Sequence, residues 1–182
     1  MSTTIIRTTQ NFSFADSLRL FNVSSDAYLS ANPTITTLVV SVVVMHNSRV
    51  LLIQRAATDG FPLQWECPGG GVDDGDVTLL HAAGRELREE SGLIMSHAEA
   101  VLDDSTEWEH GNGRCRKITF LARIDSVSQA PLMPAVTLEP TEHQDFVWAT
   151  KEEVERGLCD GRKLDFAYVG QSDTILHAFG SI

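Results

Sequence analysis

The longest apolar run in the chain, Leu38–Met45, is the feature that most restricts its fold. The run is rich in valine and far too short to span a bilayer, which takes about 20 residues as a helix. It therefore predicts a buried β-strand. Asn47-Ser48 is a dipeptide typical of turns, and Arg49–Arg55 follows as a second strand paired with the first.

Further strands and helices are predicted downstream of this pair. The expected strands are Glu99–Glu109, Arg114–Asp125 and Asp145–Ala149, and the expected helices cover residues 78–91, a segment after Thr150, and residues 172–179. Thr150 and Glu153 form a capping box for the second of these helices, and Gly157 or Gly161 ends it. Residues 126–141 carry three prolines and predict a surface loop. Strands interspersed with helices in this order predict a layered α/β or α+β domain with a mixed sheet.

The first 36 residues are expected to be an N-terminal extension that packs on a main domain of residues 37–182. Ser13 is placed to cap a short helix that ends near Phe21. Ser24 or Ser25 is placed to cap another short turn, which must end before Pro33 because the residue before a proline avoids the helical region.

Charge and cysteine content exclude several classes of function. The net charge is −11, with 14 basic and 25 acidic residues, so the surface repels nucleic-acid backbones and anionic membranes. The negative charge does not exclude a small phosphorylated substrate, because a bound cation reverses the sign of the local electric field. The three cysteines are Cys67, Cys115 and Cys159. Their odd number and wide spacing favour a reducing compartment, and without an apolar signal segment we expect a cytoplasmic protein.

The segment that points to chemistry is a glycine turn followed by an acidic helix. Gly69, Gly70 and Gly71 precede, within one short loop, a helix that carries Glu86, Glu89 and Glu90 at positions i, i+3 and i+4. These three side chains project from one face and repel each other unless positive charge lies between them. Mg²⁺ prefers oxygen ligands of this kind. A solvated acidic face with Arg–Glu pairs is the simpler alternative, but the preceding glycine turn favours the metal site.

The same segment resembles the Nudix box, Gly-x5-Glu-x7-Arg-Glu-(aliphatic)-x-Glu-Glu-x-Gly-(aliphatic). Residues 85–93 match its second half completely, whereas Val77 stands where the first glutamate belongs and Asp76 is the natural substitute. Residues 50–55 and 65–70 resemble the flanks of the box, so the resemblance covers roughly residues 36–157. It implies a Nudix-like α/β/α sandwich with a mixed sheet. The implied activity is Mg²⁺- or Mn²⁺-dependent hydrolysis of a nucleoside diphosphate linked to another moiety X.

The resemblance also assigns roles to individual residues. The metal ligands would be Glu86, Glu89, Glu90 and the carbonyl of Gly70. Arg85 would orient a glutamate through a charge-assisted pair. Family members often use a further acid on a loop before the last strand, and Glu142, six residues before Trp148, is the candidate. The general base would be either Glu86 or Glu142, and the sequence does not decide between them.

Contacts to the substrate are harder to assign. Candidates for phosphate or base contacts are Arg55, Arg114, Arg116, Lys117 and Trp65, although surface charge and core packing are the simpler readings. The sequence does not identify the small-molecule diphosphate, and a homodimer stays open. Two other functions also stay open, a catalytically silent Nudix-fold binding module and, ranked last, a prenyl diphosphate isomerase that would use Cys67.

Overall fold

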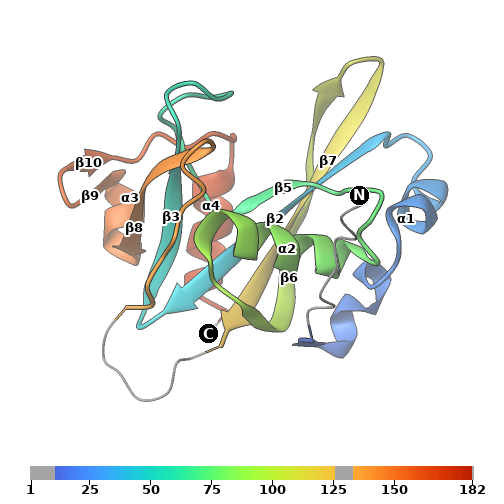
Figure 1. Cartoon of the computed structure of the whole chain (residues 1–182), viewed down its shortest axis with the longest axis horizontal. Coiled ribbons are helices and arrows are strands. Elements are labelled where there is room, and N and C mark those ends of the chain that lie inside the picture. The colour runs from blue at the N-terminus through green and yellow to red at the C-terminus, as the bar shows by residue number, and fades with distance from the viewer. Residues whose placement is uncertain (1–10, 126–132, 182) are drawn as a thin grey trace, which may run out of the picture.

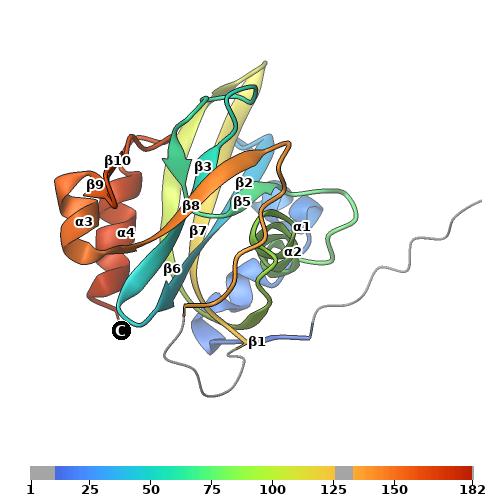
Figure 2. The ribbon, with the colours of Figure 1, turned by 60° about the vertical axis from the view of Figure 1, so that its left-hand side comes forward.

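A mixed eight-stranded sheet runs through the middle of the molecule (Figures 1 and 2). The computed structural model of the chain describes residues 11–125 and 133–181. The strands of the sheet are β1 (Ser13–Phe14), β2 (Thr37–His46), β3 (Arg49–Arg55), β4 (Trp65–Glu66), β5 (Gly69–Gly71), β6 (Met95–His110), β7 (Gly113–Ile124) and β8 (His143–Thr150). Their order is β1-β6-β7-β2-β3-β4, with β5 paired to β2 and β8 paired to β3.

Strand β2 holds the sheet together, because it pairs with three other strands. It runs parallel to β7 along most of its length, antiparallel to the glycine strand β5, and antiparallel to β3 at its far end. Val40, Val42, Val43 and Val44 are fully buried, with Val43 in one core and the other three in the core on the opposite face, as expected of a strand covered on both sides. Asn47 and Ser48 have φ values of 48° and 57° and form the turn to β3. The predicted strand pair is confirmed.

Helices cover both faces of the sheet, which makes the molecule an α/β/α sandwich (Figure 2). One face carries α2 (Leu79–Ser91), α1 (Ser25–Ala31) and the 3₁₀ helix η1 (Asp16–Phe21), and their apolar side chains form the first core. The other face carries α3 (Lys151–Arg156) and α4 (Gln171–Phe179), which form the second core. A small hairpin of β9 (Leu158–Cys159) and β10 (Arg162–Lys163) lies beside α3. The predicted fold class is confirmed.

Local sequence signals set the ends of α2 and α3. The hydroxyl of Thr78 accepts a hydrogen bond from the backbone N–H of His81 at 3.2 Å, and Gly92 ends α2 with φ 72°. The capping box of Thr150 with Glu153 opens α3 as predicted, and Gly157 ends it with φ 64°. Residues close in sequence therefore determine where α2 begins and ends, directly after the glycine turn.

The N-terminal segment departs from one prediction. Ser13 caps no helix, because Ser13–Phe14 pairs in parallel with His97 and Ala98 of β6. The 3₁₀ helix η1 begins later and has no side-chain cap. Backbone pairing with the sheet thus overrides the local capping signal. Ser24 does cap α1, where its hydroxyl accepts from the N–H of Ala27 at 3.3 Å. Four side chains in the described part of this segment are buried in the first core: Leu18, Phe21, Tyr28 and Ile35.

The remaining features of the fold are the cysteines and the loops. Cys67, Cys115 and Cys159 are buried free thiols. Strands β6 and β7 pair as a hairpin, with Gly111 at φ 59° in its turn. The predicted loop at residues 126–141 lies partly outside the described residues. None of the helices in residues 11–125 and 133–181 combines the length and apolar character needed to cross a bilayer.

Candidate active site

The glycine turn and α2 meet at two buried carboxylates. Glu90 is 4% exposed, and its Oε2 accepts a hydrogen bond from the N–H of Gly69 at 2.6 Å. Glu86 is also buried, and its carboxylate lies so close to Gly70 that an added Cβ would stand 2.8 Å from it. Position 70 must therefore be glycine for Glu86 to keep this place. Glu89, on the outer side, is largely exposed.

Arg85 holds several acidic groups around this pair. One Nη donates to Glu86 at 2.8 Å and to Glu89 at 2.9 Å. The Nε and the other Nη donate to the two oxygens of Asp76 at 3.0 and 2.9 Å, and the latter also donates to the carbonyl of Gly71 at 2.9 Å. Asp76, the acid offered by the sequence in place of the missing first glutamate, thus occupies the partner position for Arg85. One guanidinium thus donates hydrogen bonds to three carboxylates, and it also lies 3.8 Å from a carboxylate oxygen of Asp73.

The buried carboxylates carry more negative charge than their surroundings compensate. Burial raises the pKa of Glu90 to about 9, the N–H of Gly69 opposes the rise, and Glu66 and Glu86 add repulsion. Burial likewise raises the pKa of Glu86 to about 7, against the opposing charge of Arg85. Two buried acids with pKa values displaced in this direction ionise readily only when further positive charge arrives. A divalent cation supplies that charge.

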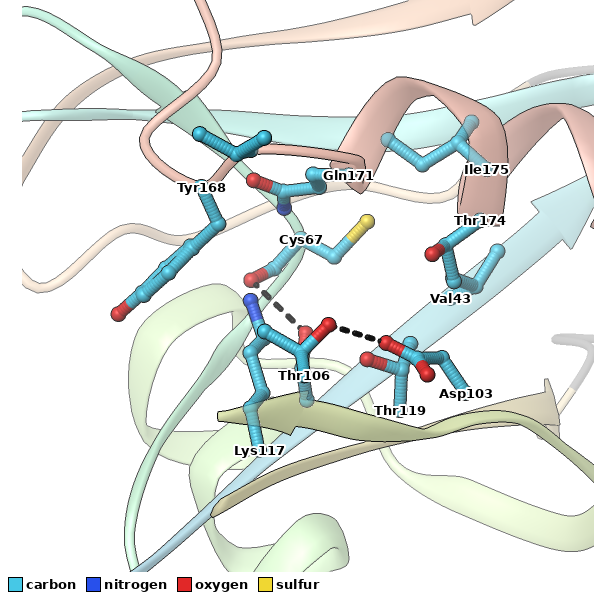
Figure 3. Close-up of a pocket in the computed structure, with 12 residues that line it drawn as sticks. Val43, Cys67, Asp103, Thr106, Lys117, Thr119, Tyr168, Gln171, Thr174 and Ile175 are labelled. Atoms are coloured by element: carbon cyan, nitrogen blue, oxygen red, sulfur yellow. Dashed lines mark hydrogen bonds between the residues drawn. The ribbon is translucent and has the colours of Figure 1, made fainter. Parts of the chain in front are cut away.

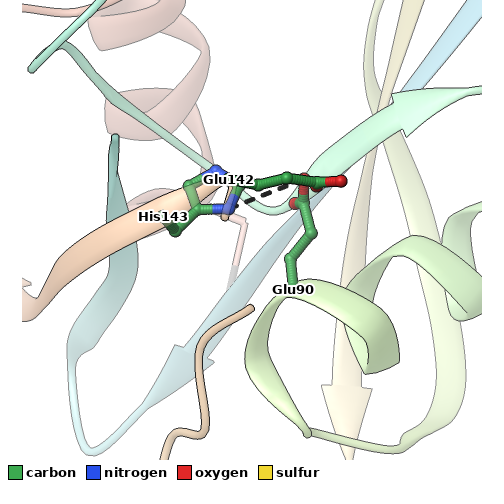
Figure 4. Close-up of side chains that lie close together, drawn as sticks. All are labelled: Glu90, Glu142 and His143. Carbon is green, nitrogen blue, oxygen red and sulfur yellow. Dashed lines mark ion pairs between the residues drawn. The ribbon is translucent and has the colours of Figure 1, made fainter. Parts of the chain in front are cut away.

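Two residues that the sequence analysis missed complete the cluster, Glu66 and His143. Strand β3 lies between them, because Ile53 pairs with Glu66 in β4 and Arg55 pairs with His143 in β8. His143 is 1% exposed, and its Nε2 lies 3.2 Å from Oε1 of Glu66. Its Nδ1 lies 3.9 Å from Oε1 of Glu90 (Figure 4). A glutamate within an apolar stretch and a histidine next to Glu142 were the only signals in the sequence.

The structure groups potential metal ligands differently from the expected triplet. Ligand atoms of Glu90, Glu142 and His143 all lie within 4.8 Å of one another (Figure 4). Among the described residues the only other such group is Glu153, Cys159 and Asp160, so the α2 triplet does not qualify as it stands. Glu86 and Glu89 bond the same nitrogen of Arg85, whereas Glu90 bonds the backbone N–H of Gly69. A buried nitrogen and two carboxylates fit a divalent cation, and the shared ion of the α2 triplet stays a prediction.

Comparison with known proteins identifies this arrangement. The family model described as NUDIX domain matches residues 36–166. The chain belongs to the Nudix family. Nudix hydrolases generally use a divalent metal and act as pyrophosphatase-type hydrolases, in keeping with the acidic group at the glycine turn.

Individual Nudix relatives span most of the chain. A nucleoside triphosphatase NudI from Enterobacter sp. (strain 638) is 30% identical over 138 residues, which cover 72% of this chain and 95% of the relative. The MutT protein from Methanosarcina mazei Go1 has a TM-score of 0.60 at 20% identity, covering 81% of this chain and 96% of that one. The NUDIX domain of Shewanella oneidensis NrtR, complexed with ADP ribose, has a TM-score of 0.61 at 19% identity, covering 92% and 98%. These two structures establish the likeness of fold.

A small pocket in this Nudix domain lies on the face of the sheet opposite α2 (Figure 3). Lys117 on β7 is 5% exposed, and its Nζ stands 3.7 Å above the ring of Tyr168. Burial lowers the pKa of the Lys117 ammonium, while Glu66 and Cys67 oppose the change. The buried amide of Gln171 lines the same pocket, and neither its oxygen nor its nitrogen has a hydrogen-bond partner in the described part of the chain. Of the predicted substrate contacts, Lys117 is the one that lines this pocket.

The other predicted contacts are engaged elsewhere in the Nudix domain. Arg55 lies beside the cluster, but its guanidinium bonds Glu66 and Asp59. Arg116 donates to Glu107, Tyr28 and Asn32, and Arg114 donates to Glu107 and Glu109. Trp65 is 0% exposed and packs in the second core, so its ring has no face open to a ligand. The structure does not bring Arg114, Arg116 or Trp65 to the carboxylate cluster.

Proposed function

We propose that this protein is a Mg²⁺- or Mn²⁺-dependent hydrolase that cleaves the diphosphate linkage of a nucleoside diphosphate joined to another moiety. The observation that carries the proposal is the excess of buried carboxylate at the glycine turn. Glu86 and Glu90 are buried there with raised pKa values, and the single guanidinium of Arg85 is shared with Asp76 and Glu89. A domain that only had to fold would gain by replacing such acids, because uncompensated buried charge destabilises it.

The residues divide into those that hold the cation and those that act on water. When bound, the cation neutralises phosphate oxygens and makes water a better nucleophile. Glu90 and Glu142 hold it, with Glu89 and the Gly70 carbonyl as further ligands. Arg85 fixes the direction of the Glu86 carboxylate through its 2.8 Å hydrogen bond.

We assign the general base to Glu86. Glu142 belongs to the group of ligand atoms around Glu90, whereas Glu86 stands outside that group and faces the turn. The roles of general base and metal ligand are distinguished by two substitutions. Glu86→Gln is expected to lower kcat and leave the Kd for Mn²⁺ nearly unchanged, and Glu142→Gln is expected to raise that Kd. The reverse pattern would exchange the two assignments.

The relatives and the pocket support the proposed substrate class. The NudI relative is a nucleoside triphosphatase, and the NrtR domain is complexed with ADP ribose. A nucleoside triphosphate and ADP-ribose each join a nucleoside to at least two linked phosphates. Lys117 and Tyr168 would receive the part of such a substrate that extends beyond the cluster, with the ammonium near its phosphates and the ring against its base.

The test is a substrate panel at fixed Mg²⁺ or Mn²⁺. The panel contains nucleoside triphosphates, ADP-ribose and dinucleoside polyphosphates, and mass spectrometry of products formed in ¹⁸O-water locates the cleaved bond. Metal-dependent turnover of at least one member that EDTA abolishes is expected. Binding of a panel member without turnover under either metal would instead establish a catalytically silent binding module. The isomerase alternative is disfavoured, because burial raises the pKa of the Cys67 thiol to about 12 and keeps it neutral.

A further inference from the structure

His143 has the arrangement of a metal-binding histidine. The ring is 1% exposed, and Nε2 lies 3.2 Å from the carboxylate of Glu66, itself 2% exposed. The other nitrogen, Nδ1, is buried and has no hydrogen-bond partner among the described residues. Metal-binding histidines usually donate one ring N–H to a carboxylate, which leaves the lone pair of the other nitrogen free for the ion. Glu66 supplies the first half of that pattern, and the free Nδ1 supplies the second.

Nδ1 also points at the carboxylates on which the proposed function rests. It lies 3.9 Å from Oε1 of Glu90, and ligand atoms of Glu142 complete a group within 4.8 Å (Figure 4). Two ligand atoms that share one ion at about 2.1 Å each stand no more than about 4.2 Å apart, so the first pair already fits. The backbone places Glu142 firmly, because its carbonyl accepts a hydrogen bond from the N–H of Ala56 at 2.8 Å.

We propose that Nδ1 of His143 is a direct ligand of the divalent cation, beside Glu90 and Glu142, with Glu66 setting the tautomer of the ring. The proposal rests on the proposed function insofar as the ion binds at this cluster. It adds a nitrogen to a set of oxygen ligands. Imidazole binds transition metals better than it binds Mg²⁺, so the site prefers Mn²⁺ to Mg²⁺ more strongly than carboxylates alone would.

The chain offers a matched variant and a matched control. In His143→Gln the side-chain amide N–H can take the place of Nε2 and still donate to Glu66, but no nitrogen lone pair remains at the position of Nδ1. The control is His46→Gln, because Nε2 of His46 is also buried without a hydrogen-bond partner in the described part of the chain. The ring of His46 packs against Trp148 at 6.1 Å between centroids and belongs to no potential ligand group.

The experiment is pulsed EPR of Mn²⁺ bound to the full chain, prepared with natural histidine and with ¹⁵N-histidine. We expect electron-spin-echo modulation from a directly bound ¹⁴N that shifts to ¹⁵N frequencies with the label. We also expect His143→Gln to lose the modulation and to bind Mn²⁺ about tenfold or more weakly, with a smaller loss for Mg²⁺. His46→Gln is expected to retain both properties.

One outcome would overturn the assignment of His143 as a ligand and leave the proposed hydrolase intact. In that outcome Glu90→Gln abolishes Mn²⁺ binding, but the spectrum of bound Mn²⁺ shows no modulation from histidine nitrogen. Mn²⁺ binding unaffected by Glu90→Gln would instead remove the cation site itself. The spectrum of the ¹⁵N-labelled wild-type protein decides whether a histidine nitrogen binds Mn²⁺, even if His143→Gln fails to fold.

Discussion

Arginines and glutamates meet at two places in this molecule, and the two places differ in charge balance. On the β6–β7 hairpin, Arg114 and Arg116 face Glu107 and Glu109, so each acid has a basic partner. Hydrogen bonds from Arg116 lower the pKa of Glu107. At the glycine turn a single arginine, Arg85, serves three carboxylates, and buried acids nearby have raised pKa values.

The difference shows that residue type alone does not define a metal site. The hairpin pairs are exposed or half-buried, neutralise each other and need no ion. The turn keeps Glu86 and Glu90 out of water and leaves them short of positive charge. Excess buried carboxylate costs folding free energy, and a divalent cation offsets that cost while supplying the chemistry.

The largest expected effect is on catalysis at the turn. Glu89→Gln or Glu90→Gln should lower kcat by about 10³-fold or more, because each removes an anionic ligand from the cation that stabilises the transition state. Steady-state kinetics with the substrate found in the panel measures this loss, and circular dichroism checks that the fold survives. Full activity in either variant would show that the acids of the turn, like those of the hairpin, hold no catalytic cation.

A second effect depends on the space beside Glu86. Gly70→Ala places a methyl group 2.8 Å from the Glu86 carboxylate, so it displaces the assigned general base and should lower kcat by about 10- to 100-fold. Gly71→Ala is the matched control, since nothing lies within 4 Å of the added carbon. Steady-state kinetics at saturating Mn²⁺ compares the two variants. Equal effects of both substitutions would indicate general damage to strand β5.

A third effect appears in the stability of the metal-free protein. The pKa of Glu90 rises from 4.5 to about 9 on folding, so the folded state binds more protons between these values and stability falls as pH rises through that window. Glu90→Gln removes this term and should raise the free energy of unfolding by about 1–2 kcal/mol at pH 8, with little change at pH 4. Urea titrations in EDTA at both pH values measure it. A variant less stable than wild type at pH 8 would mean that the charge of Glu90 is already compensated.

The smallest effect is expected on the hairpin. Glu107→Gln removes the shared partner of Arg114 and Arg116, yet ion pairs that still reach solvent contribute little. We expect kcat and the Kd for Mn²⁺ to stay within about twofold of wild type. A large loss of metal binding would show that the hairpin contributes to the site.

Local patterns made much of this structure predictable. The valine run, the apolar stripe of α2 and the capping box at Thr150 each specify an element through residues close in sequence, and the turn and α2 carry Glu86, Glu89, Glu90 and Arg85 together. Glu66 and His143 escaped prediction because β3 pairs with both β4 and β8 and joins residues 77 positions apart. Ser13 was misassigned for the same physical reason, since its partner strand β6 is distant in the chain.

The most direct measurement is anomalous diffraction from crystals soaked in MnCl₂. We expect a manganese peak at the glycine turn, about 2.2 Å from carboxylate oxygens that include one of Glu90. A peak only between Glu107 and Glu109 of the hairpin, or no peak at the turn at saturating Mn²⁺, would contradict a cation site built from buried, uncompensated carboxylates.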